Sequence, residues 1–128
     1  MTLNWQTLLA VGSGGFIGAA LRFYVGVVVS QKFPNDIPLA TLGVNIVGSF
    51  FMGMLVAIFI IYTPSHLVRL FLLTGFLGAL TTYSTFAIES YFLLNTSLLL
   101  GLLNIVLNLL GSIVAAAIGY KLLTYFLK

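Results

Sequence analysis

The sequence contains no cysteine, and charged side chains make up only 5% of its 128 residues. Without cysteine, the chain has no disulfide framework, no thiolate metal site and no thiol nucleophile. A soluble domain typically carries about 25% charged residues, so this composition excludes an ordinary soluble domain. The five Lys and Arg residues are also too few to form the basic patch that holds nucleic acid. We therefore expect no nucleic-acid partner.

Hydrophobic residues, in contrast, make up 61% of the chain, which indicates a protein surrounded by membrane lipid. Because one spanning helix takes about 20 residues, four helices would use about 80 and leave room only for short connections. No sizeable domain outside the membrane fits in the remainder. We interpret residues 1–128 as a single transmembrane domain, with movement of a solute as the leading function.

Three short polar or proline-containing segments, at 30–38, 63–66 and 95–97, divide the apolar sequence. Proline favours loops and the first turn of a helix. We therefore predict an all-α membrane protein with four transmembrane helices, at about 5–30, 38–62, 67–94 and 98–126. An even number of spans places both termini on the same side of the membrane.

The few basic residues give only a weak preference for one orientation. Arg69, Lys121 and Lys128 fall on one side, and Lys32 with the more inward Arg22 falls on the other. Because the Lys and Arg bias of short loops sets orientation, copies could insert both ways and pair about a twofold axis in the membrane plane. Four helices of this length leave little space for a pore within one copy, so we expect an oligomer.

Polar side chains within the spans need a partner or a function, because burying them in lipid costs free energy. The amide of Asn45 offers two uncharged N–H donors that can replace water around a dehydrated anion. The alternative is a hydrogen bond that ties two helices together. Asn104, Asn108 and Ser112 are spaced by four, so they line one helix face over about 12 Å and suggest a polar track.

Arg22 has two interpretations of equal weight. It could attract anions into a vestibule, or its long side chain could reach the membrane interface or bind carbonyl groups. Glu89 is expected near the interface, toward the end of the third helix. We assign no role to Glu89 or to His66.

The third predicted helix is unusual at its centre, where residues 75–86 read GFLGALTTYSTF. Hydroxyl and β-branched residues are weak helix formers, so we expect a broken helix whose freed carbonyls bind an ion or another group. The alternative is a continuous helix whose hydroxyls bond back to the preceding turn. Tyr83 and Phe86 lie three apart, and their positive ring edges could face an anion.

Segment 75–86 resembles the third-helix signature of the small fluoride channels called Fluc or CrcB. GGFIGAALR, which ends at Arg22, resembles their first-helix motif, and TLGVN, which ends at Asn45, resembles their second-helix motif. Length and helix plan agree over essentially the whole chain. The resemblance implies an antiparallel, dual-topology homodimer in the bacterial inner membrane, with two pores that export fluoride passively and catalyse no reaction.

The resemblance also implies roles for individual residues. Asn45 would line the pore, Tyr83 and Phe86 would supply paired ring edges, and Arg22 would lie at a vestibule. The family usually has phenylalanine where this chain has Tyr83, so the effect of the added hydroxyl is open. The further candidates for the anion pathway all carry a hydroxyl or an amide, and they are Thr82, Ser84, Thr85, Asn104, Asn108 and Ser112.

The same resemblance implies a structural sodium ion that is not transported, held by main-chain oxygens of Gly78 and Thr81. The alternative function is a small multidrug-type antiporter, which exchanges cations for protons and is also a four-helix dimer. Such an antiporter needs a membrane carboxylate in its first helix, and this chain has Arg22 there. A non-transporting assembly subunit would explain closely spaced glycines such as Gly14 and Gly18, which let helices pack tightly. It would not explain the row of hydrogen-bond donors at Asn104, Asn108 and Ser112.

Overall fold

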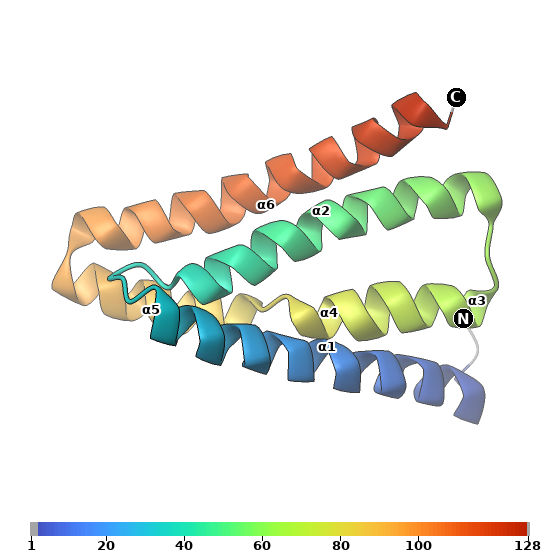
Figure 1. Ribbon diagram of the computed structural model, residues 1–128, viewed down its shortest axis with the longest axis horizontal. Coiled ribbons are helices and arrows are strands. Elements are labelled where there is room, and N and C mark those ends of the chain that lie inside the picture. Colours follow the sequence, from blue (N-terminus) through green and yellow to red (C-terminus); the bar gives the residue numbers. More distant parts are fainter. Residues whose placement is uncertain (1–2, 128) are drawn as a thin grey trace.

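The computed structural model describes residues 3–127, which form a bundle of long helices (Figure 1). The first, second and last spans are single helices, and the third is divided into four elements. The elements are α1 (Trp5–Lys32), α2 (Leu39–Tyr62), α3 (His66–Arg69), the π-helix η1 (Leu70–Leu77), α4 (Gly78–Leu80), α5 (Tyr83–Thr96) and α6 (Leu98–Phe126). Within the described residues, four helical stretches are long and apolar enough to cross a membrane. The predicted spans are therefore confirmed to within two residues at each end.

The polar segments between the spans also cap the helices. At the start of α1, Asn4 Oδ1 accepts a hydrogen bond from the Thr7 amide at 2.9 Å, and Thr7 Oγ1 accepts one from the Asn4 amide at 3.0 Å. Ser97 Oγ accepts a bond from an amide in the first turn of α6. Because a helix leaves its first amides without intrahelical partners, these residues fix where α1 and α6 begin.

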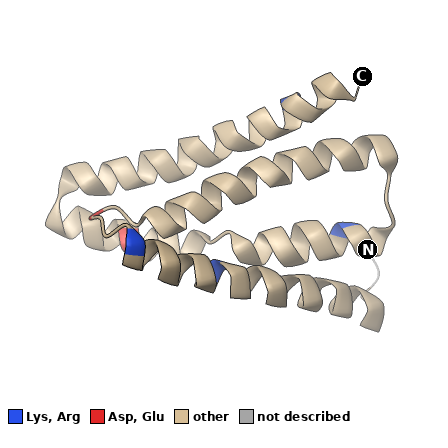
Figure 2. Cartoon of the chain, in the orientation of Figure 1, with Lys and Arg blue, Asp and Glu red and all other residues tan. Residues whose placement is uncertain are grey.

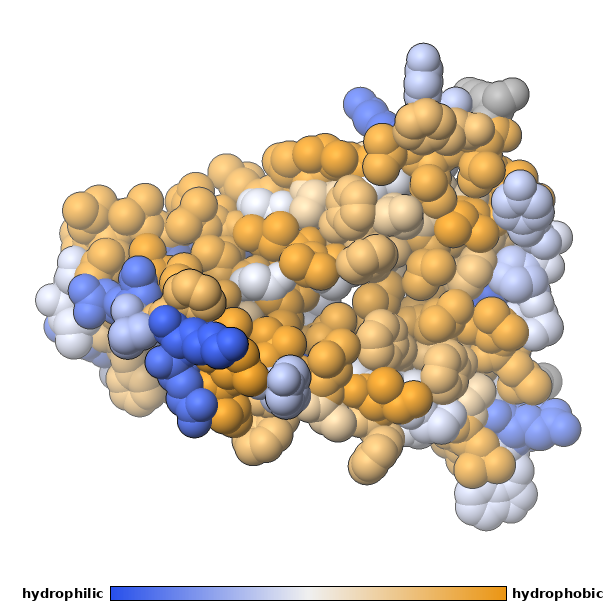
Figure 3. Space-filling view, viewed as in Figure 1, coloured by the Kyte–Doolittle hydropathy of each residue, from blue (hydrophilic) through white to orange (hydrophobic). Residues whose placement is uncertain are grey.

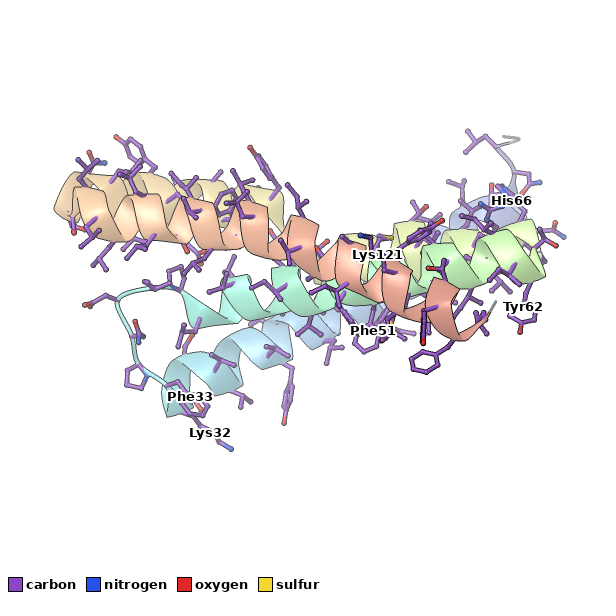
Figure 4. The ribbon with its side chains drawn as sticks, turned by 90° about the horizontal axis from the view of Figure 1, so that it is seen from above. Lys32, Phe33, Phe51, Tyr62, His66 and Lys121 are labelled. Atoms are coloured by element: carbon purple, nitrogen blue, oxygen red, sulfur yellow. The ribbon has the colours of Figure 1, made fainter. Side chains whose placement is uncertain are left out.

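The bundle has two ends, and the start of α1 and the end of α6 lie at the same one (Figure 1). Figure 4 shows Lys32 and Phe33 at one end, and Tyr62 and His66 at the other. His66 is the first residue of α3 and belongs to the helix more than to the connection. The prediction that both termini lie on one side concerns residues outside the described range, but the first and last described helices agree with it, since α1 begins where α6 ends.

The surface is apolar and much of the interior is polar, the reverse of a soluble protein. Figure 3 shows hydrophobic residues over the middle of the molecule and hydrophilic ones toward the two ends. Figure 2 shows that charged positions are few and that α2 has none. The buried polar residues, in contrast, come from every span and are Thr7, Thr41, Asn45, Thr82, Ser90, Asn104 and Asn108. This distribution suits a bundle whose solvent is lipid.

Glycines allow the helix backbones to approach closely. A Cβ atom added to Gly14 or Gly18 of α1 would collide with main-chain carbonyls of η1, and one added to Gly53 or Gly119 would collide across the contact between α2 and α6. Close backbone approach of this kind holds helices together in lipid. The small-residue stripes therefore pack the bundle internally, with α1 against the first half of the third span and α2 against α6.

The third span departs from a regular helix in two places. The break between α4 and α5 was predicted, whereas the π-helix η1 was not. After the break, the helix changes neighbours, because η1 and α4 pack against α1 and α5 packs against α6. The break therefore lies where the chain passes from one side of the bundle to the other.

Candidate functional site

The site is built around the break at Thr81 and Thr82, whose backbones are extended with φ, ψ of −79°, 157° and −148°, 119°. Thr82 caps the second half of the helix, because its hydroxyl oxygen accepts a hydrogen bond from the Thr85 amide at 3.3 Å. The Thr82 hydroxyl in turn donates to the Thr85 hydroxyl oxygen at 2.9 Å. The hydroxyl-rich sequence therefore supplies both the interruption and the cap that restarts the helix.

Asn45 of α2 bridges the break. Its Oδ1 accepts a hydrogen bond from the Thr82 amide at 2.8 Å, and its Nδ2 donates to the Thr82 carbonyl at 3.0 Å. Asn45 thus satisfies both main-chain groups of the extended residue, which lipid could not do. The interhelical role that the sequence left open as an alternative is present in the structure.

The first half of the helix ends with carbonyl groups whose usual amide donors bond elsewhere. In a continuous helix the Thr82 amide would donate to the Gly78 carbonyl, and the Thr85 amide would donate to the Thr81 carbonyl. Here these two amides bond to Asn45 and to the Thr82 hydroxyl instead. Gly78 is exposed, and Thr81 is partly exposed. The carbonyls of Gly78 and Thr81 therefore lack their usual helical donors at the break.

A one-way chain of hydrogen bonds runs from Asn45 into the α5–α6 contact. Asn45 Nδ2 donates to Asn108 Oδ1 at 2.9 Å, and Asn108 Nδ2 donates to both the Oδ1 and the carbonyl of Asn104 at 3.1 Å. Asn104 Nδ2 then donates to Ser90 Oγ at 2.9 Å, and the Ser90 hydroxyl donates to the Phe86 carbonyl at 2.7 Å. Asn104 is 0% exposed and Asn108 is 3% exposed, so this chain ties the second half of the helix to α6 and α2.

A cavity of about 240 Å³ lies beside this chain, and most of the predicted pathway residues line it. The rings of Tyr83 and Phe86 meet edge to face there, with centroids 5.5 Å apart and planes at 68°. Tyr83 is 74% exposed, whereas Phe86 is 6% exposed. The remaining lining residues are mostly polar and include Asn45, Ser49, Thr81, Thr82, Asn108 and Ser112. We call this space the asparagine cavity.

A larger cavity of about 670 Å³ opens on the other side of Thr82 and is lined by residues of α1, α2 and α5. Arg22 and Thr85 lie on its wall, together with Thr41 and Glu89, whose Oε1 accepts a hydrogen bond from the Thr41 hydroxyl at 2.8 Å. Glu89 Oε2 is buried and has no hydrogen-bond partner among the described residues. We call this space the vestibule. Thr82 lines both cavities, so it lies in the wall between them.

The structure brings together most, but not all, of the residues that the sequence singled out. Ser84 is exposed and lines neither cavity, and Asn104 lies behind Asn108 in the hydrogen-bonded chain. Sequence reasoning missed Ser90, although it follows Phe86 by one helical turn. It also missed the pairing of Thr41 with Glu89, because nothing in the spacing of residues 48 positions apart indicates contact.

No group of three or more His, Cys, Asp or Glu side chains within residues 3–127 is arranged to hold a metal ion.

Comparisons with known proteins identify the family of this chain. Residues 9–120 match the family described as CrcB-like protein, Camphor Resistance (CrcB). The chain belongs to this family. It is 56% identical to the fluoride-specific ion channel FluC of Sulfurimonas denitrificans, over 98% of this chain and 99% of that protein.

More distant relatives bear the same description. The chain is 42% identical to the FluC of Nautilia profundicola, over 98% of this chain and 100% of that protein. It is 41% identical to the FluC of Methanocaldococcus jannaschii, over 89% of this chain and 91% of that protein. Membership of the CrcB family contradicts the alternative of a small multidrug antiporter, and with its four apolar helices the chain is a multi-pass membrane protein.

Proposed function

We propose that this protein is a fluoride-selective channel of the bacterial cell membrane, which lowers the toxic concentration of fluoride in the cytoplasm by passive export. The observation that carries the proposal is the asparagine cavity, where uncharged amide and hydroxyl groups and two aromatic edges meet at a helix break. The names of the relatives, fluoride-specific ion channels, support the same function.

The proposed mechanism replaces the water around a small, strongly hydrated anion. Amide N–H groups, hydroxyl groups and the positive edges of the rings would each take the place of a water molecule. The first amides of α5 lack intrahelical partners, and a helix N-terminus favours negative charge. A neutral weak acid enters the cell and releases its anion there, so the membrane potential alone drives the anion outward.

We propose that the pathway runs from the vestibule past Thr82 to the asparagine cavity. Arg22 and Thr85 would lie at its entrance, and Asn45, Tyr83, Phe86 and Ser112 would line its narrow part. Ser84 and Asn104 stay predicted members of the pathway. This route leads to the exposed side of α5, where a second surface is needed to enclose it.

We propose that this second surface is another copy of the chain in the opposite orientation. The carbonyls of Gly78 and Thr81 lack their usual helical donors, and Gly78 and Ser84 are exposed near the middle of a span. Hydrocarbon cannot satisfy such groups, so they must be covered by protein or water. An antiparallel homodimer with its twofold axis near the break would cover them in both copies and give two pores.

The same carbonyls fit the structural sodium ion that the family resemblance implies. Gly78 and Thr81 present main-chain oxygens without their helical donors. A bound sodium ion would coordinate these oxygens in place of the missing donors. This can be tested by measuring the midpoint of thermal unfolding of the purified protein in a sodium buffer and in a buffer with N-methylglucamine in place of sodium. We expect a lower midpoint without sodium, and an unchanged midpoint would remove this part of the proposal.

Reconstitution tests the channel function directly. Liposomes that contain the pure protein and a fluoride gradient should release fluoride to a selective electrode once the membrane potential is clamped near zero. Chloride and a cationic dye serve as control solutes and should stay inside. Release of the dye without release of fluoride would overturn the proposal.

The absence of cysteine makes the dimer easy to test by crosslinking. A Gly78→Cys variant should form a disulfide-linked dimer in bilayers, because residues at the proposed axis meet their own copies. Leu98→Cys is the matched control, since α6 begins there and antiparallel copies hold this residue on opposite sides of the membrane. Crosslinking through Leu98 but not through Gly78 would contradict the antiparallel arrangement.

A further inference from the structure

The amide of Asn45 has no free hydrogen to offer an anion in this structure. A primary amide has two N–H groups, and those of Asn45 bond to the Thr82 carbonyl and to Asn108 Oδ1. If Asn45 is to bind fluoride, one of these two partners must leave. The two bonds differ in how much breaking each would cost.

The bond to Thr82 is the harder one to give up. It is one of a pair, because Asn45 also accepts a hydrogen bond from the Thr82 amide at 2.8 Å. Turning Nδ2 away from Thr82 would leave the carbonyl of an extended residue without a donor inside the membrane, which is unfavourable. The pair therefore fixes the plane of the Asn45 amide.

The bond to Asn108 is a single contact between two side chains, and both side chains line the asparagine cavity. Asn108 presents only its oxygen to Asn45, because its own Nδ2 donates away from Asn45, to the Oδ1 and the carbonyl of Asn104. Asn104 is in turn held by Ser90. Asn108 is thus oriented as an acceptor, and it cannot donate to an ion without breaking these bonds to Asn104.

We propose that Asn108 Oδ1 is an internal acceptor that occupies the place of the anion, and that fluoride enters the site by displacing it from Asn45 Nδ2. A hydrogen bond to an anion is roughly twice as strong as one between neutral groups, so an arriving anion can take the donor. When the anion leaves, the Asn108 oxygen returns and keeps the polar donor satisfied. This inference rests on the proposed function and assigns Asn108 a role opposite to that of a direct anion ligand.

The two roles predict opposite changes when the Asn108 amide is removed. In Asn108→Ala and in Asn108→Leu, which keeps the branched shape, Asn45 loses its competing acceptor. One net hydrogen bond corresponds to roughly a fivefold change in affinity. We therefore expect the half-saturating fluoride concentration for efflux from liposomes to fall roughly fivefold in both variants. A direct ligand would give a rise in that concentration, and a rise or no change would overturn the proposal.

Asn95 supplies the matched control, since it is an exposed asparagine of α5 that donates only to the Tyr91 carbonyl of its own helix. The variants Asn95→Ala and Asn95→Leu make the same chemical changes outside the site. They should leave the half-saturating concentration unchanged. A fall of the same size in the Asn95 variants would show that the effect does not come from the site, and would overturn the proposal.

A measurement on the unmodified protein does not depend on how the variants fold. With asparagine side chains labelled with ¹⁵N and the protein in bilayers with fluoride, dipolar coupling to ¹⁹F identifies the nitrogen that lies beside the bound ion. We expect coupling to Asn45 Nδ2 and none to Asn108 Nδ2. Coupling to Asn108, or to neither, would overturn the proposal. Coupling at Asn45 without any fluoride efflux would contradict the channel function and leave the displacement intact.

Discussion

The two halves of the third span, before and after the break, are held in the bundle by different kinds of contact. The first half, His66–Leu80, packs against α1 through glycines, so that main chain lies against main chain. The second half, Tyr83–Thr96, is held by side-chain hydrogen bonds, from Thr41 of α2 to Glu89 and from Asn104 of α6 to Ser90. The first kind of contact needs an absence of side chains, and the second needs particular side chains with their donors correctly directed.

This difference explains why the candidate site lies where the halves meet. Glycine contacts fix the position of a helix but offer no polar group to a solute. The asparagine and serine contacts place donors and acceptors beside a cavity, at the cost of burying polar groups that must all find partners. The break combines a rigid support on one side with an adaptable polar wall on the other.

The largest effect is expected from removing the side chain of Asn45, which bonds to Thr82 at the break between the two halves. Asn45→Ala loses the pair of hydrogen bonds to Thr82 and the donor proposed to bind the anion, and at about 1 kcal/mol each these three losses correspond to roughly a 100-fold change. We expect fluoride efflux from liposomes to fall by roughly that factor. Asn95→Ala is the control, and full efflux in Asn45→Ala would remove Asn45 from the pathway.

The glycine contacts of the first half can be broken with a single methyl group. A Cβ on Gly18 would collide with the Phe76 carbonyl, whereas one on Gly12 of the same helix would meet nothing within 4 Å. We expect Gly18→Ala to lower the free energy of unfolding by about 3 kcal/mol, because overpacked interiors must shift. Thermal unfolding in detergent measures this change. Equal midpoints for Gly18→Ala and Gly12→Ala would show that close approach does not hold this half.

Breaking the hydrogen-bonded chain at its far end, at Ser90, should lower the free energy of unfolding by a smaller amount. Ser90→Ala leaves the buried Asn104 amide without its acceptor, which costs about 1–2 kcal/mol of unfolding free energy. The control is Ser13→Ala, since Ser13 is exposed and its hydroxyl bonds to the Leu9 carbonyl of its own helix. A loss of stability in Ser90→Ala no larger than in Ser13→Ala would mean that the chain does not stabilise the contact between α5 and α6.

The smallest effect is expected when the hydroxyl group of Tyr83 is removed. Its side chain is 74% exposed, and its ring already meets Phe86 edge to face. Tyr83→Phe keeps the ring, so we expect efflux to stay within about twofold of the natural protein. A larger change in either direction would show that the hydroxyl itself takes part in the pathway.

Local sequence signals predicted the spans, the break and most of the cavity lining. Proline and polar segments marked the ends of the helices, and the run of hydroxyl residues at 81–85 marked the interruption. The π-helix η1 could not be predicted in this way, because six of its eight residues are Leu or Phe, as in an ordinary membrane helix. Its wider turns accompany the close fit of η1 against Gly14 and Gly18, which involves residues far away in the sequence.

The sequence by itself determined that this protein is a four-span membrane bundle with a broken third helix, since apolar length and helix-breaking residues act locally. Only the tertiary structure decided which polar groups meet. Asn45 carried two readings in the sequence, a donor to an anion or a tie between helices, and the fold shows the tie. The direction of each hydrogen bond along Asn45, Asn108, Asn104 and Ser90 depends on residues brought together from three helices, and sequence spacing does not encode that arrangement.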